Sequence, residues 1–356
     1  MGPIRVLVVD DSVVIRRLVT TVLEGDPDVV VVGTAASGRI ALAKLDQLAP
    51  DVVTLDVEMP DLDGIGTLRE LRKTRSRLPV VMFSTLTERG AAKTLEALSL
   101  GASDYVCKPA NVGSVPEAMA AVRDQLIPKI KALVPGRSVA VARPAAPVPH
   151  QQPGSAPTGR VDVLAIGSST GGPDALSAVL TVLPASLPVP VVVVQHMPPV
   201  FTRLLAQRLD AKCGLQVKEA EDGDLLRPGL VLVAPGDRHL EVHAGPAGPR
   251  AVLTSAPPES FCRPAVDVLF RSVLSVYGDR TLAVVLTGMG SDGARGADQL
   301  RRAGAEVLAQ DEATSVVWGM PGAVVAAGAA HRVLPLHAVA ADVQRVLARG
   351  RTAVAV

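Results

Sequence analysis

The chain alternates short apolar runs with helical patterns, and this alternation restricts the folds it can adopt. Strand-like runs such as residues 4–9, 52–55 and 80–83 are each followed by a segment with the apolar spacing of an amphipathic helix. Strands that alternate regularly with helices are typical of α/β domains built on a parallel sheet. Five such units precede residue 135. They predict a doubly wound, five-stranded parallel (βα)5 domain.

A proline-rich stretch divides the chain into two parts. Residues 135–159 contain six prolines, no acidic residue and no periodic apolar face, which is typical of a semi-extended linker. A second α/β pattern begins at residue 161, and short strands and turns over 215–242 predict an antiparallel excursion. We therefore expect a first domain over 1–125, a helix end and linker over 126–159, and a mainly parallel α/β domain over 160–350.

Composition excludes several classes of function. Aromatic residues make up 2% of the chain and the net charge is +1, so neither base stacking nor a basic surface predicts binding to nucleic acid. No apolar run reaches the ~20 residues of a membrane span, and the first residues lack the long apolar region of a signal peptide. The three cysteines are isolated and without metal-ligand spacing. We expect a cytoplasmic protein without direct membrane insertion.

A serine lies in a turn that favours nucleophilic chemistry. Ser169 is the central residue of a Gly-x-Ser-x-Gly frame, Gly167 to Gly171, directly after the apolar run 161–166. In a strand-to-helix turn of this kind the hydroxyl is exposed beside backbone N–H groups that can hold an oxyanion. The frame also fits a phosphate-binding loop or an ordinary turn. The nucleophile interpretation therefore depends on a base and an acid elsewhere.

A histidine and an aspartate follow two other strand-like runs. His196 comes after 189–194, and Asp292 follows 281–286 after a short loop. The carboxyl ends of parallel strands meet at one edge of a sheet, so Ser169, His196 and Asp292 could meet there. Their chain order differs from that of α/β-hydrolases, which argues against that fold and not against a triad. His239, after the run 231–234, is a rival for the base.

Polar side chains also follow successive strands in the first part. Asp10 and Asp11 end the first strand-like run and Asp56 ends the third. Three carboxylates at one edge repel one another unless a hard cation lies between them, and this chemistry suits Mg²⁺. Ser84 ends the fourth run and Lys108 the fifth. Their hydroxyl and ammonium groups could hold phosphoryl oxygens.

With the flanking sequences Leu55–Pro60, Asp63-Gly64 and Lys108-Pro109, these residues resemble the receiver domain of two-component response regulators over residues 1–125. The resemblance implies phosphorylation of Asp56 by a chemotaxis histidine kinase. The other roles that it implies are Mg²⁺ ligands (Asp10, Asp11, Asp56 and the Glu58 carbonyl), phosphoryl contacts (Ser84 and Lys108) and a switch aromatic (Tyr105).

The second part resembles the chemotaxis protein-glutamate methylesterase family. The matching stretches are 166–172, 195–198, 234–239, 287–293, 310–313 and 319–321, and receiver, linker and esterase in that order is the architecture of this family. The resemblance implies Ser169 as nucleophile, His196 as base in preference to His239, and Asp292 as orienting acid. Backbone N–H groups at Thr170 and Met289 are the expected oxyanion donors.

The chain departs from the family pattern at three positions. Ser168 stands where alanine is common, and Cys262 and Ala265 replace a usual histidine and serine beside Arg263-Pro264. These departures concern substrate contact more than the chemistry.

The implied function is a phosphorylation-activated serine esterase of chemotaxis adaptation. It would demethylate glutamyl methyl esters on methyl-accepting chemoreceptors, with release of methanol, and deamidate specific glutamines. Mg²⁺ would serve the receiver, and the esterase chemistry would need no cofactor. The alternative is a response regulator with a non-catalytic nucleotide-binding or receptor-docking second domain that uses 167–172 and 288–293 as phosphate loops. No P-loop lysine follows either loop, which disfavours it.

Overall fold

A computed structural model describes residues 2–109, 114–135 and 159–352. The chain divides into two compact units, Met1–Arg143 and Pro144–Val356. The linker predicted over 135–159 lies outside the described residues, apart from its two end positions.

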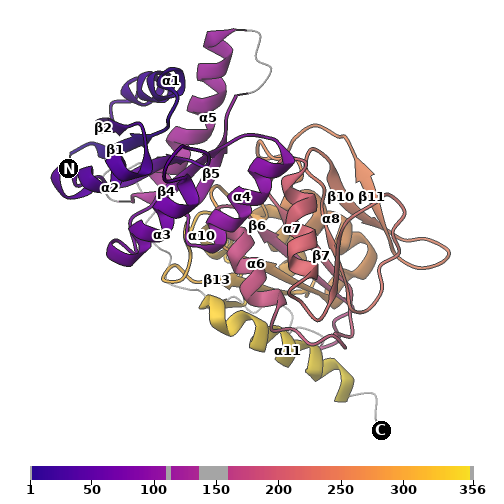
Figure 1. The fold of residues 1–356 in the computed structure, drawn as a ribbon. Coiled ribbons are helices and arrows are strands. Elements are labelled where there is room, and N and C mark those ends of the chain that lie inside the picture. Colours follow the sequence, from indigo (N-terminus) through magenta and orange to yellow (C-terminus); the bar gives the residue numbers. More distant parts are fainter. Residues whose placement is uncertain (1, 110–113, 136–158, 353–356) are drawn as a thin grey trace. The chain divides into compact units, whose positions relative to one another are not determined.

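The first unit, coloured indigo to purple in Figure 1, is built on a five-stranded parallel sheet. The order of its strands is β2-β1-β3-β4-β5. This order confirms the predicted doubly wound (βα)5 fold. Its strands are β1 (Ile4–Val9), β2 (Val29–Ala35), β3 (Val52–Asp56), β4 (Val80–Ser84) and β5 (Asp104–Cys107). Its helices are α1 (Val13–Glu24), α2 (Gly38–Leu48), α3 (Gly64–Thr74), α4 (Glu88–Ser99) and α5 (Val115–Leu133).

Each helix of this unit begins at a residue that suits a helix N-terminus. The side-chain oxygen of the preceding residue accepts a hydrogen bond from a backbone N–H of the first turn, which satisfies a donor that has no partner within the helix. The capping residues are Ser12, Ser37, Asp63, Thr87 and Ser114. Local sequence thus explains where the chain leaves the loop that follows each strand.

The second unit contains a seven-stranded parallel sheet with the order β14-β13-β12-β6-β7-β9-β8. Its strands are β6 (Val163–Ser168), β7 (Val191–Gln195), β8 (Gln216–Glu219), β9 (Leu230–Val233), β12 (Thr281–Val285), β13 (Glu306–Gln310) and β14 (Arg332–Leu334). Its helices are α6 (Gly172–Leu180), α7 (Phe201–Asp210), α8 (Val266–Tyr277), η1 (Gly278–Arg280), α9 (Ala294–Arg302), α10 (Met320–Ala326) and α11 (Leu336–Thr352).

The predicted antiparallel excursion is present; it begins within the expected region 215–242 and extends beyond it. Strands β10 (His239–His243) and β11 (Arg250–Thr254) form the antiparallel pair. β8 and β9, in contrast, are parallel to each other, because the segment between them returns the chain to the same end of the sheet.

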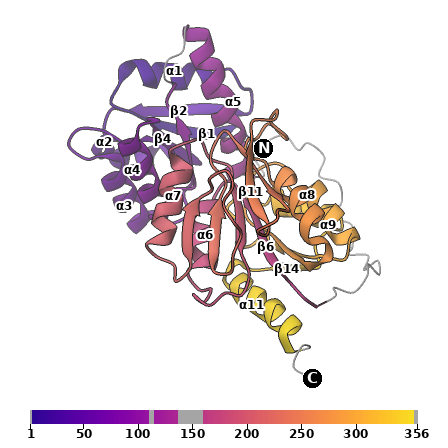
Figure 2. The same ribbon diagram turned by 90° about the vertical axis from the view of Figure 1, so that its right-hand side faces the viewer.

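Helices cover both faces of the larger sheet. Helix α6 contacts α7 and α11, whereas α9 contacts α8 and α10, and Figure 2 shows α6 and α7 on the other side of β6 from α8 and α9. Every residue of β6, β7 and β12 is buried. Burial on both faces explains why these strands are continuous apolar runs. None of the helices that the structure describes combines the length and hydropathy of a membrane span.

Candidate active site

The central strands of the second unit bring the predicted triad residues to one edge of the sheet. The strand β7, which follows β6 in the chain, lies on one side of β6, and β12, which comes much later in the chain, lies on the other side. The edge above β6 is therefore a topological switch point, where α/β sheets bind ligands. Ser168 pairs with Gln195 in the β6–β7 register. Ser169 and His196 are therefore equivalent positions one residue beyond the paired strands.

The Ser169 backbone is fixed from several directions. Its N–H donates to the Thr287 carbonyl at 3.0 Å, and its own carbonyl accepts from the Gly172 N–H at 2.7 Å. The Gln195 side-chain amide donates to the same carbonyl at 2.9 Å. The Ser169 hydroxyl, in contrast, makes no hydrogen bond to any residue that the structure describes. The turn therefore holds the serine firmly and leaves its Oγ available.

Sequence reasoning missed the role of the Gln195 side chain in holding the candidate site together. Its amide nitrogen contacts the carbonyls of both Ser169 and His196, at 2.9 and 3.4 Å, and its Oε1 accepts from the Ser168 hydroxyl at 2.7 Å. The side chain thus connects the two strand ends that carry the nucleophile and base candidates. Ser168, which departs from the family pattern, supplies the hydrogen bond that orients the Gln195 amide.

His196 and Asp292 are in direct contact, although 96 residues separate them. The imidazole Nε2 lies 2.8 Å from Asp292 Oδ2, and the two side chains are 10% and 2% exposed. A carboxylate on Nε2 fixes this nitrogen as the N–H donor, so Nδ1 remains as the ring nitrogen with a lone pair. The geometry therefore assigns Nδ1 as the atom that can accept a proton.

The N-terminus of helix α8 holds the Asp292 carboxylate. The backbone N–H of Val266 donates to Oδ2 at 2.6 Å, and that of Asp267 donates to Oδ1 at 2.9 Å. Burial by itself raises the pKa of Asp292, but the hydrogen bonds from His196, Asp267 and Val266 outweigh it, so this pKa is lowered. The positive end of the helix dipole acts in the same direction. Asp292 is thus held as an anion.

A cysteine contacts the remaining nitrogen of His196. Cys262 Sγ lies 3.6 Å from Nδ1. Burial lowers the pKa of His196, but the hydrogen bonds with Asp292 and Cys262 more than compensate and raise it to about 9. The thiol is a weak donor, so it can yield this nitrogen to a stronger hydroxyl donor. The sequence marked Cys262 as a departure from the family pattern, without indicating this contact.

The rival histidine has a structural position. His239 is fully buried; its Nε2 lies 3.1 Å from the Pro257 carbonyl, and its Nδ1 accepts from the Ala265 N–H at 3.2 Å. Both ring nitrogens thus have backbone partners and neither is available to a reacting hydroxyl. The geometry favours His196 over His239 as the base.

The two expected oxyanion donors lie on loops beside Ser169. Thr170 follows Ser169 directly and is 5% exposed. Met289 follows Gly288, whose N–H bonds to the Val317 carbonyl at 3.0 Å. The Met289 N–H has no hydrogen-bond acceptor among residues 2–109, 114–135 and 159–352, as an oxyanion donor in a free enzyme requires.

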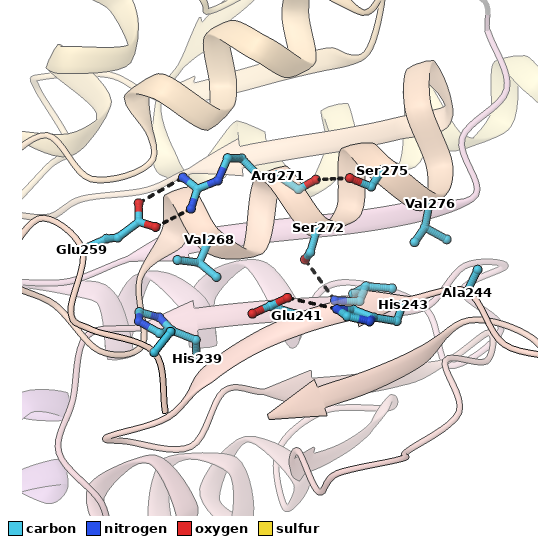
Figure 3. A pocket seen from close by; sticks show the side chains of 12 residues that line it. His239, Glu241, His243, Ala244, Glu259, Val268, Arg271, Ser272, Ser275 and Val276 are labelled. Atoms are coloured by element: carbon cyan, nitrogen blue, oxygen red, sulfur yellow. Dashed lines mark hydrogen bonds and ion pairs between the residues drawn. The ribbon is translucent and has the colours of Figure 1, made fainter. Parts of the chain in front are cut away.

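A separate cavity of about 590 Å³ lies between the β10–β11 hairpin and α8 (Figure 3). None of the three triad candidates lines it. Glu259 and Arg271 at one end form a two-pronged ion pair, and His243 lies 3.0 Å from Glu241. Its charged groups therefore already have partners within the protein.

The first unit contains an acidic cluster at the carboxyl edge of its sheet. Carboxylate oxygens of Asp10, Asp11 and Asp56 all lie within 4.8 Å of one another. Lys108 Nζ contacts Asp56 Oδ2 at 2.8 Å and Asp10 Oδ2 at 3.0 Å. Burial raises the pKa of Asp56 to about 6; the hydrogen bond from Lys108 opposes this shift and the Asp10 charge adds to it. These oxygen donors fit a hard divalent cation.

The remaining predicted receiver positions are Ser84, Tyr105 and Glu58, and they differ in their contacts. The Ser84 hydroxyl accepts from Thr94 Oγ1 at 2.6 Å and donates to the Gly90 carbonyl at 3.2 Å. Tyr105 is 7% exposed, and Lys129 Nζ lies 5.0 Å from its ring centroid. The Glu58 carboxylate pairs with Lys93 at 3.1 Å; the predicted metal contact is the Glu58 backbone carbonyl.

Fold and sites together define a class of protein, in which a response-regulator receiver unit and an α/β unit with the arrangement of a serine hydrolase share one chain. Family comparisons agree. The CheB methylesterase model matches residues 164–343, and the response regulator receiver model matches residues 6–120. The chain belongs to the CheB methylesterase family.

Individual relatives cover nearly the whole chain. A protein of Nocardioides sp. named protein-glutamate methylesterase/protein-glutamine glutaminase is 58% identical, and the match covers 99% of this chain and 97% of that protein. A protein of the same name from Trichodesmium erythraeum is 48% identical, over 97% of this chain and 99% of that protein. The crystal structure of the Thermotoga maritima CheB methylesterase catalytic domain is 43% identical with a TM-score of 0.51, and covers 53% of this chain and 98% of that chain.

Proposed function

We propose that the protein is a serine esterase of chemotaxis adaptation that hydrolyses glutamyl methyl esters on chemoreceptors and deamidates specific receptor glutamines. The names of the relatives support methylated glutamates and glutamines of proteins as the substrate groups. The observation that carries the proposal is the contact between His196 Nε2 and Asp292, made at the same sheet edge as a firmly held Ser169 whose hydroxyl is unengaged.

The proposed reaction begins at Ser169. Its Oγ attacks the ester carbonyl carbon while His196 Nδ1 takes the hydroxyl proton, and Asp292 stabilises the imidazolium that forms. The N–H groups of Thr170 and Met289 donate to the developing oxyanion, a contribution of about 3 kcal/mol per donor. The imidazolium then gives its proton to the departing methoxy group, so methanol leaves and an acyl-enzyme remains.

Water completes the cycle by the same groups. His196 Nδ1 takes a proton from water as the water oxygen attacks the acyl carbon, and Ser169 leaves as the hydroxyl when the proton returns. The products are the free glutamate carboxylate and the parent enzyme. A glutamine side chain follows the same route with ammonia as the leaving group.

The first unit is the proposed control element, with Asp56 as the phosphoacceptor and a histidine kinase as the donor. Asp10, Asp11, Asp56 and the Glu58 carbonyl would hold Mg²⁺, which neutralises charge on the transferring phosphoryl group. Lys108 already contacts two of these carboxylates and would pair with the phosphoryl oxygens. Ser84 would rotate from the Gly90 carbonyl toward the phosphoryl group, and Tyr105 would respond to that movement. We place the reaction in the cytoplasm.

Methanol release tests this function. Receptor-containing membranes carrying methyl-labelled glutamyl esters should lose labelled methanol when the protein is added, and Ser169→Ala should abolish the release. Normal release by Ser169→Ala, or none by the parent protein toward any methylated receptor preparation, would contradict the proposal.

A further inference from the structure

One aromatic side chain lies entirely in solvent next to the candidate active site. The chain has four phenylalanines, and Phe83, Phe201 and Phe270 are at most 2% exposed. Phe261 is 104% exposed. Single exposed apolar residues are common on proteins. This one is unusual because a chain so poor in aromatic residues uses the other three phenylalanines to fill its core.

The backbone at Phe261 adopts a costly conformation. Glu259 and Cys262 pair through two hydrogen bonds of 2.8 and 3.1 Å and close a tight two-residue turn. Both central residues are left-handed, with φ of 50° at Ser260 and 63° at Phe261. Glycine and asparagine are the usual residues in such a turn, because a bulky side chain is strained there. Strain of this kind concentrates at functional sites.

Ion pairs brace the base of the turn. Glu259 forms the two-pronged pair with Arg271 shown in Figure 3, and Arg295 lies 3.4 Å from the same carboxylate. On the other side, the Arg263 guanidinium pairs with Asp237. These contacts fix both ends of the turn on the body of the second unit, so the phenyl ring projects from a rigid support.

The residues that follow the turn contact the proposed catalytic groups. Cys262, the residue after Phe261, contacts His196 Nδ1, and four residues later the Val266 N–H holds Asp292. A macromolecule whose side chain reaches Ser169 therefore approaches the surface from which Phe261 projects, whereas a small ester can enter without touching it.

From this placement we propose that Phe261 is a docking anchor that binds an apolar side chain on the surface of the protein substrate beside the modified glutamate. The inference rests on the proposed function, because it requires a reacting group carried by a protein. The exposed ring becomes buried only in the enzyme–substrate complex. This burial offsets the free-energy cost of the strained turn.

Phe261→Ala in the full-length chain tests the proposal with two substrates. With methylated receptor the variant should raise KM by about ten- to a hundredfold, the effect of losing burial of one phenyl ring. With N-acetylglutamate γ-methyl ester it should keep the parent kcat/KM. Phe261→Leu should recover most of the affinity for receptor. Val182→Ala, which truncates another exposed apolar side chain (61% exposed) beyond the end of α6, should leave both substrates unaffected.

A stability measurement separates docking from a structural role. Phe261→Gly should raise the thermal unfolding midpoint, because glycine relieves the left-handed strain, while it weakens receptor turnover as Phe261→Ala does. A lower midpoint would indicate that the ring supports the fold and would overturn the proposal.

Three other outcomes are decisive. Unchanged receptor KM in Phe261→Ala, with a parent protein active on both substrates, would overturn docking and leave the proposed function intact. A parent protein inactive on both substrates would instead overturn the function. Higher unstimulated activity of Phe261→Ala on the small ester would identify the receiver unit as the occupant of Phe261 and contradict binding to substrate.

Discussion

At the scale of single residues, hydrogen bonds distinguish His196 from His239, the two histidines that follow strand-like runs. His239 uses both ring nitrogens on backbone groups, whereas His196 uses one on Asp292 and the other on a weak thiol donor. Only His196 can exchange a proton with a neighbouring hydroxyl without breaking a backbone contact. This difference, more than the position of either residue along the chain, supports the assignment of the base.

The assignment predicts different defects for the two histidines. Ser169→Ala and His196→Ala should each lower kcat/KM for the ester by at least about 10⁴-fold, because the residues of a triad act as a unit. His239→Ala should chiefly lower the unfolding midpoint, since it removes buried hydrogen bonds. Ester hydrolysis and thermal unfolding of the three variants provide the comparison. A crippled but stable His239→Ala with an active His196→Ala would reverse the assignment.

The Cys262 contact predicts a shift in pH dependence. The contact contributes to the raised pKa of His196, and a general base acts only when neutral, so activity should increase as pH rises through that pKa. Cys262→Ala removes one raising contribution, so the pKa falls and the acid limb of kcat/KM moves to lower pH. The profile is measured with the small ester, and Cys213→Ala serves as the matched thiol control. An acid limb that stays in place, or moves to higher pH, would contradict this role.

At the scale of elements, the N-terminus of α8 is the feature that holds Asp292, the proposed orienting carboxylate, at the sheet edge. Two of its first N–H groups hold the Asp292 carboxylate, and the same carboxylate orients His196. N–H groups at a helix start have no partner within the helix, so they are free to bind an anion. The start of the helix therefore holds Asp292 through backbone groups.

Val266→Pro tests this role of the helix. Proline is well accepted at the first position of a helix, and the extended backbone of Ala265 (φ −119°, ψ 140°) suits a residue before proline. The variant removes one N–H donor to Asp292, and a hydrogen bond to a charged group contributes about 1.5–3 kcal/mol. We expect kcat to fall by about tenfold or more with the fold retained. Val266→Ala keeps the donor and removes only side-chain packing, so it should retain more activity than Val266→Pro; equal losses in both variants would point to packing instead.

At the scale of the whole molecule, the receiver and hydrolase units carry separate sites. A substitution in one site should therefore leave the chemistry of the other intact. Asp56→Ala should keep the unstimulated esterase rate and lose the response to a small phosphodonor, because phosphorylation shifts an equilibrium only through contacts that the phosphoryl group makes. Rates with and without the donor are the measurement, and stimulation of the variant equal to that of the parent would refute the assignment.

Metal removal should likewise affect the response to phosphodonor and not the unstimulated hydrolysis. A chelator should prevent stimulation of the parent by phosphodonor, because the carboxylate cluster of Asp10, Asp11 and Asp56 fits the cation that phosphoryl transfer uses. It should leave the unstimulated hydrolysis unchanged, since the proposed triad needs no metal. Loss of unstimulated activity on chelation, restored by Mg²⁺, would contradict a metal-free esterase site.

The sequence by itself determined the two α/β units and which residues stand at strand ends. Both are local properties: apolar periodicity fixes strands and helices, and a parallel sheet brings strand ends such as Ser169 and His196 to one edge. It located only the start of the antiparallel pair, at β10, since strand direction depends on where a connection leads the chain.

Only the tertiary structure decided how each group is held. The contact of His196 with Asp292 spans 96 residues, and that of Asp292 with Val266 spans 26. No local sequence pattern indicates such pairings. The two backbone hydrogen bonds of His239, the Cys262 contact with His196 and the α8 N–H groups that bind Asp292 therefore appeared only in the folded chain. The exposure of Phe261 belongs with them, because burial depends on how distant segments pack, and a phenylalanine followed by cysteine and arginine gives no local indication of it.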